Sequence, residues 1–133
     1  MNLEIKILVL ATLWQVATLG LASFVATRDA GPKWNLGPRD KTPELSPLAG
    51  RLKRAANNGL EGLALFTVAC LAVTMTGTSS RLTLACAAVY MISRLLYVPA
   101  YALALAPWRS LIWASGNLAT VIMLIASLVP LSL

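Results

Sequence analysis

The sequence predicts an all-α integral membrane protein in which four transmembrane helices form an up-down bundle. The chain has 133 residues, of which 58% are hydrophobic and only 12% are charged, whereas a soluble domain usually carries about 25% charged residues. The apolar residues also gather in four blocks. Each block is long enough to cross about 30 Å of hydrocarbon at 1.5 Å per residue. A chain of this length forms a single domain, residues 1–133.

The first apolar block predicts a helix over residues 5–27. A cleaved signal peptide is the alternative, because residues 26–30 resemble a cleavage region. The block is too long for a signal sequence, and the charges of Glu4 and Lys6 before it cancel. Residues 28–46 contain three prolines and two glycines, a composition typical of a polar loop.

A helix over residues 47–76 follows this loop. Ser46 is the expected N-cap and Pro47 the first helical residue, a position that tolerates proline. Gly77 is the expected C-cap. Such a helix is about 45 Å long, more than a membrane needs, so its first turns are expected to protrude.

The third helix is predicted over residues 81–106 and the fourth over residues 108–129. Pro99 lies inside the third helix, where proline removes a hydrogen bond and favours a kink. Pro107 marks the break between the two helices.

The charge distribution predicts the topology. The net charge is +6, and seven of the eleven basic residues lie between residues 28 and 54. Basic loops stay on the inner side of a membrane, so the loop 28–46 is expected in the cytoplasm. A basic cluster beside membrane segments indicates anionic lipid, and not nucleic acid, as its partner.

The residue types exclude several kinds of site. The chain has no histidine and only two cysteines, Cys70 and Cys86. Both cysteines lie in apolar blocks, where they are expected to act as small apolar residues. No metal site is therefore expected, because the usual nitrogen and sulfur ligands are missing.

Polar residues form a stripe along the predicted second helix. They are spaced three and four residues apart and so share one helix face: Arg51, Arg54, Asn58 and Glu61. Charged side chains that face lipid cost several kcal/mol, so this stripe must face protein, water or a polar ligand. Arg51 alone is also explained as a charge at the lipid headgroups.

A second stripe follows the third helix, and its members are Tyr90, Arg94, Tyr97 and Tyr101. The helix rise places both stripes at similar depths, so together they predict a polar pocket, with Arg109 and Ser110 at its mouth. Two alternatives remain: Tyr101 is an interface anchor, and Arg94 forms an ion pair with Glu61. Gln15 either joins the pocket or hydrogen-bonds between helices.

Three motifs resemble those of the MAPEG family, the membrane-associated proteins of eicosanoid and glutathione metabolism. The second helix contains Arg-Ala-x-x-Asn-x-x-Glu from Arg54 to Glu61, followed by Phe66. The third helix contains Arg94-x-x-Tyr97-x-x-x-Tyr101. The fourth begins with Pro-x-Arg-Ser, residues 107–110. The chain is most similar to a bacterial branch that resembles microsomal glutathione transferases and prostaglandin E synthases.

The resemblance implies a homotrimer of four-helix subunits in the bacterial inner membrane, with glutathione as co-substrate bound between neighbouring subunits. It implies that glutathione contacts Arg54, Asn58, Glu61, Tyr97 and Tyr101. Arg109 would activate the thiol, and the further candidates for the site are Arg28, Arg51, Arg94 and Ser110.

These residue types suit glutathione. Arginine binds carboxylates, and glutamate pairs with an ammonium group. One arginine in a shielded site can stabilise the reactive thiolate without a general base. The expected activity is addition of glutathione to hydrophobic electrophiles, or reduction of lipid hydroperoxides. The alternatives are a non-catalytic member that binds lipid or a partner, like the five-lipoxygenase-activating protein, and a small multidrug transporter. The essential glutamate of such transporters lies in the first helix, where this chain has only Glu4.

Overall fold

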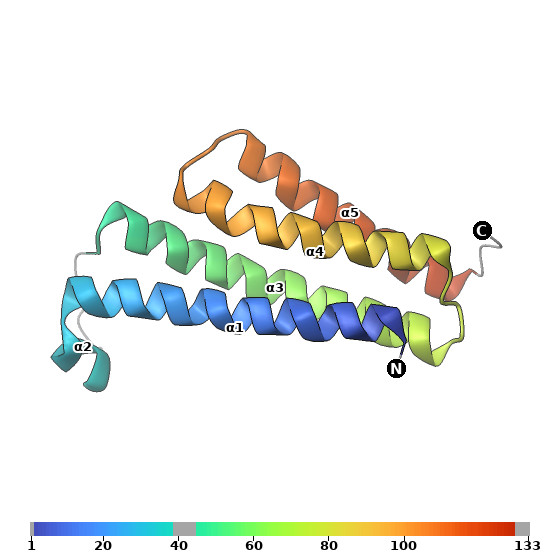
Figure 1. Ribbon diagram of the computed structural model, residues 1–133, viewed down its shortest axis with the longest axis horizontal. Coiled ribbons are helices and arrows are strands. Elements are labelled where there is room, and N and C mark those ends of the chain that lie inside the picture. Colours follow the sequence, from blue (N-terminus) through green and yellow to red (C-terminus); the bar gives the residue numbers. More distant parts are fainter. Residues whose placement is uncertain (1, 39–44, 130–133) are drawn as a thin grey trace.

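A computed structural model describes residues 2–38 and 45–129 and confirms the all-α membrane fold (Figure 1). Its four long helices are each long and apolar enough to span a membrane: α1 (Leu3–Ala30), α3 (Pro47–Met75), α4 (Arg81–Ala102) and α5 (Trp108–Leu128). α1 continues to Ala30, three residues past its predicted end at residue 27, and a short helix, α2 (Pro32–Leu36), follows it. The predicted loop 28–46 is therefore partly helical. Residues 39–44 of that loop lie outside the described residues.

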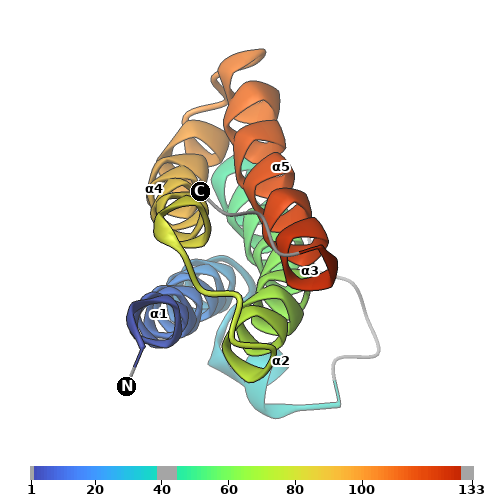
Figure 2. The same cartoon turned by 90° about the vertical axis from the view of Figure 1, so that its right-hand side faces the viewer.

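Successive long helices run antiparallel, as the up-down bundle requires. α2, the start of α3 and the connection between α4 and α5 gather at one end of the bundle, which we call the α2 end (Figure 1). α3 and α4 form the centre, because each of them contacts both α1 and α5. Within the described chain α1 and α5 do not contact each other, and they lie on opposite sides of the central pair (Figure 2).

The packed interior consists mainly of small and aromatic side chains. Phe66 of α3 stacks on Tyr90 of α4, with ring centroids 3.9 Å apart. Large aliphatic side chains point outward instead; Leu13 and Leu118, for example, are 61% and 62% exposed. This arrangement suits a membrane, where lipid covers the outer apolar surface and small residues let helices approach closely.

Glycines accommodate polar side chains at three helix contacts. A methyl group added at the glycine would collide with the polar side chain in each of these pairs: Gly59 with Gln15, Gly62 with Arg94, and Gly116 with Ser93. Gln15 donates a hydrogen bond of 2.8 Å from Nε2 to the Ala56 carbonyl. Of the two roles expected for Gln15, the structure therefore shows the hydrogen bond between helices.

The N-cap of α3 is Ser46, as predicted, whereas the C-cap is Thr76 and not the predicted Gly77. The Ser46 hydroxyl accepts a hydrogen bond from the Ala49 N–H at 3.2 Å, and Pro47 opens the helix. At the other end Gly77 has a φ of +67°, which glycine adopts without steric strain. The Thr78 N–H donates to the Val73 carbonyl at 3.1 Å, as in a Schellman motif.

α4 ends at Ala102, four residues before the predicted end at residue 106. A Schellman motif closes it: the Leu105 N–H donates to the Ala100 carbonyl at 2.9 Å, and Ala104 has a φ of +56°. The sequence did not predict this cap, because the position is usually occupied by glycine and here holds Ala104. α4 continues through Pro99, and α5 begins directly after Pro107, as predicted.

The end of the bundle opposite α2 contains a buried carboxylate. Glu4 of α1 is only 2% exposed. Its Oε1 atom accepts hydrogen bonds from the hydroxyls of Ser79 at 2.6 Å and Thr83 at 2.8 Å. This cluster joins the beginning of α1 to the beginning of α4.

Candidate functional site

The two predicted polar stripes face each other across the contact between α3 and α4. Asn58 Nδ2 donates a hydrogen bond of 2.9 Å to the Tyr97 hydroxyl, and Arg54 Nε donates one of 3.0 Å to the Tyr101 hydroxyl. Residues 54 and 58 lie one turn apart, as do residues 97 and 101. Because the helices are antiparallel, these equal spacings bring both pairs into register.

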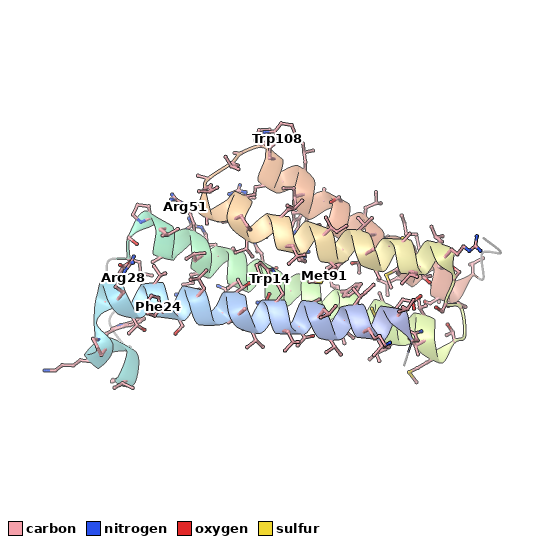
Figure 3. All side chains as sticks on the ribbon, viewed as in Figure 1. Trp14, Phe24, Arg28, Arg51, Met91 and Trp108 are labelled. Carbon is pink, nitrogen blue, oxygen red and sulfur yellow. The ribbon has the colours of Figure 1, made fainter. Side chains whose placement is uncertain are left out.

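α5 completes the site from the other side of Tyr101. The guanidinium carbon of Arg109 lies 4.7 Å from the Tyr101 ring centroid, which is a cation–π distance. Tyr101 therefore contacts both arginines with its ring, since the guanidinium carbon of Arg54 lies 5.8 Å from the same centroid. Its hydroxyl accepts a hydrogen bond from Arg54. The neighbouring Trp108 is 63% exposed and points away from the bundle (Figure 3).

A cavity of about 230 Å³ opens between α3, α4 and α5. Its lining residues are Asn58, Glu61, Tyr97, Tyr101, Arg109, Ser110 and Trp113. The walls thus offer one carboxylate, one guanidinium, an amide and several hydroxyls. This set can bind a small zwitterionic molecule, because each charged group of such a ligand meets a partner of opposite sign.

The structure brings six of the residues proposed from the sequence to this cavity, and Arg54 adjoins it through Tyr101. Trp113 was missed, although it lies four residues after Arg109 and so on the same face of α5. That spacing is a signal from which sequence reasoning could have found it.

Arg28 and Arg51 lie at the α2 end but do not line the cavity (Figure 3). Arg51 Nε donates a hydrogen bond of 3.0 Å to the Ala102 carbonyl and so caps the last turn of α4. Arg28 lies 3.8 Å from the Asp29 carboxylate. This is the one ion pair within 4 Å among residues 2–38 and 45–129.

Arg94 lies beneath the cavity wall and not in it. Its side chain is buried, and the ion pair with Glu61 considered from the sequence is not formed. The guanidinium packs instead against Gly62 and between the rings of Tyr90 and Tyr97. Glu61 remains exposed at the cavity edge.

The chain was compared with known proteins. No curated protein matches it. No solved structure matches it either. The model of the MAPEG family, in contrast, matches residues 7–129, nearly the whole chain. The chain therefore belongs to the MAPEG family, and it is an integral membrane protein of the glutathione and eicosanoid metabolism type.

Proposed function

We propose that the protein is a membrane-bound glutathione transferase that adds the glutathione thiolate to hydrophobic electrophiles. The cavity between α3, α4 and α5 supports this proposal most strongly. It joins Glu61, Arg109 and Ser110 to two tyrosines in one open space of about 230 Å³. Family membership supports the choice of glutathione as co-substrate.

The residues that line the cavity, together with Arg54 beside it, match the groups of glutathione. Arg54 and Arg109 supply positive charge for the carboxylates or the thiolate. Glu61 is the negative group that lines the cavity, and it pairs with the ammonium group. Asn58, Tyr97 and Tyr101 offer hydrogen bonds to the amides. Arg94 is buried behind the cavity wall, and Arg51 donates a hydrogen bond to the Ala102 carbonyl, so neither is proposed as a direct contact.

Arg109 is the proposed thiolate-stabilising residue. A free thiol with a pKa near 8.5 is only slightly ionised at neutral pH. Lowering that pKa by about two units requires roughly 2.7 kcal/mol of preferential stabilisation of the thiolate. A guanidinium in a partly shielded site can supply this energy. The thiol proton passes to solvent, sulfur bonds to the electrophilic carbon, and the leaving group departs with its bonding electrons.

The same thiolate also suits hydroperoxide reduction. Two glutathione molecules would then reduce a lipid hydroperoxide to an alcohol and water, and they would leave as the disulfide. Both reactions begin with the same activated sulfur. The hydrophobic second substrate would enter from the membrane.

The exposed polar groups of α3 support assembly with a neighbouring subunit. Arg54 and Glu61 are both exposed in the single chain, and contact with lipid would be costly at their depth. We propose a homotrimer in which the next subunit covers this face and glutathione binds at the boundary. The bacterial inner membrane, with the loop 28–46 in the cytoplasm, agrees with the basic residues at the α2 end.

The test is the ultraviolet absorbance of thiolate when purified protein binds glutathione at neutral pH. The parent should show this absorbance, and Arg109→Ala should lose it. Arg81→Ala is the control, because Arg81 opens α4 at the end of the bundle opposite α2 and does not line the cavity. If the parent binds glutathione without any thiolate absorbance, the transferase proposal is wrong.

A non-catalytic member that binds lipid or a partner is the second candidate. The cavity supports it in one respect, because 230 Å³ is below the roughly 300 Å³ at which typical ligand pockets begin. A conjugation assay with a chloro-nitrobenzene electrophile separates the two functions. Glutathione binding without turnover would favour the non-catalytic function.

A further inference from the structure

Arg94 is a buried charge without a hydrogen-bond partner. The residue is 5% exposed, and none of its three guanidinium nitrogens makes a hydrogen bond in the described structure. Buried polar groups are nearly always paired, and each exception requires an explanation. The burial of an unpaired charge inside a membrane protein is especially costly.

The guanidinium of Arg94 is closely packed by residues of α3 and α4. The guanidinium carbon lies 5.0 Å from the Tyr90 ring centroid and 5.6 Å from the Tyr97 ring centroid. The negative faces of the rings attract the cation, and neither tyrosine hydroxyl makes a hydrogen bond with it. Gly62 of α3 leaves space for this guanidinium, because an added Cβ there would lie 2.5 Å from Nη2 of Arg94. A side chain at this position would displace the guanidinium.

Tyr97 connects Arg94 to the candidate site. One side of Tyr97 contacts Arg94, and the residue also lines the cavity with Asn58 and Glu61. Arg94 itself is not a lining residue, so it does not touch a ligand there. Its charge still acts on the cavity, because Tyr97 lies between them and protein screens charge less than water does.

We propose that Arg94 is a positioning residue whose uncompensated charge makes the cavity attract anions through Tyr97. The negative groups of the ligand then meet this charge, which no ion pair within 4 Å among the described residues neutralises. For glutathione this inference rests on the proposed function. The attraction of anions in general does not depend on the proposed function.

Two substitutions separate charge from packing. Arg94→Lys keeps the charge and loses the planar shape, whereas Arg94→Gln keeps a polar group and loses the charge. We expect Arg94→Gln to weaken glutathione binding by about tenfold, as for one unit charge acting at an effective dielectric near 20. Arg94→Lys should bind glutathione within about threefold of the parent. Glutathione ethyl ester, which carries less negative charge, should be less affected by Arg94→Gln.

A second measurement does not require glutathione. Trp113 lines the cavity and is one of four tryptophans. Its fluorescence is obtained by subtracting the signal of Trp113→Phe. Iodide is an anionic quencher and acrylamide a neutral one. The ratio of the iodide quenching constant to the acrylamide quenching constant therefore reports anion preference at the cavity. This ratio should fall in Arg94→Gln and be retained in Arg94→Lys.

The outcomes separate this inference from the proposed function. If Arg94→Gln and Arg94→Lys lose the iodide preference equally, Arg94 acts through packing and the proposed role of its charge is wrong. The role is also wrong if neither variant changes the preference. If the parent binds no glutathione but Arg94→Gln still lowers the ratio, the glutathione proposal fails and the role of Arg94 stands. If Arg94→Gln does not fold, Gly62→Ala displaces the guanidinium instead. Gly116→Ala is its control, because that methyl group would meet the uncharged Ser93.

Discussion

The guanidinium of Arg109 lies 4.7 Å from the ring centroid of Tyr101, so the proposed thiolate-binding residue is positioned by an aromatic ring of α4. The hydroxyl of the same tyrosine accepts the hydrogen bond from Arg54 at 3.0 Å. Tyr101 thus links a cation of α3 to a cation of α5. Arg54 also lies 5.8 Å from the centroid of this ring, but its hydrogen bond requires the hydroxyl, so substitution can remove that bond and leave both ring contacts in place.

Tyr101→Phe is expected to keep the ring beneath Arg109 and to lose only the hydroxyl. The KM for glutathione should rise by up to about tenfold, because one hydrogen bond to a charged group contributes about 1.5 kcal/mol. The kcat should change less than threefold, since the Arg109 contact remains. Steady-state conjugation kinetics measures both parameters.

Tyr101→Leu is the matched comparison because it removes the ring as well. Arg109 then loses its support, and kcat should fall at least as steeply as the affinity for glutathione. If the two variants show equal kcat values, the ring does not position Arg109.

The hydrogen bond between Asn58 and Tyr97 should contribute modestly to stability. Such bonds between transmembrane helices average about 0.6 kcal/mol in double-mutant cycles. A cycle of Asn58→Ala and Tyr97→Phe, measured by unfolding in detergent, should give a coupling of that size. A coupling indistinguishable from zero would mean that the 2.9 Å contact does not stabilise the bundle, contrary to this prediction.

Sequence reasoning predicted the α3–α4 contact well because it depends on regular spacing. Equal steps of four residues on antiparallel helices bring Arg54 to Tyr101 and Asn58 to Tyr97. The same logic pairs Glu61 with Arg94, and there it fails. Gly62 leaves space for the guanidinium beside Glu61, and ring contacts replace the expected ion pair.

The structure also differs from the sequence-based prediction at positions where the sequence has no periodic pattern. α2 is only five residues long, too short for a helical pattern to emerge. The end of α4 depends on Ala104 in a conformation that the sequence would normally assign to glycine. Arg51 belongs to the polar stripe by spacing, yet the nearby Ala102 carbonyl takes its hydrogen bond. Local competition of this kind is not visible in the sequence.

Gly59→Ala is expected to destabilise the bundle by about 1–3 kcal/mol. The new methyl group would collide with Gln15 and break its buried hydrogen bond to the Ala56 carbonyl. Gly20→Ala is the control, because a Cβ there meets nothing within 4 Å. Alanine favours helix, so the control should be neutral or stabilising by up to about 1 kcal/mol. Thermal unfolding in detergent compares the two, and equal effects would contradict the proposed collision.

Glu4→Ala should destabilise the protein without changing the candidate site. The substitution removes the acceptor of two hydroxyl groups, from Ser79 and Thr83, and a loss of about 1–3 kcal/mol is expected. Glu4→Gln keeps an acceptor oxygen and should lose less than half as much. Because Glu4 lies at the end opposite α2 (Figure 1), the affinity for glutathione should stay within twofold of the parent in both variants. Unfolding and glutathione titration, measured on the same samples, test this separation. A larger loss of affinity at unchanged stability would mean that the two ends of the bundle are coupled.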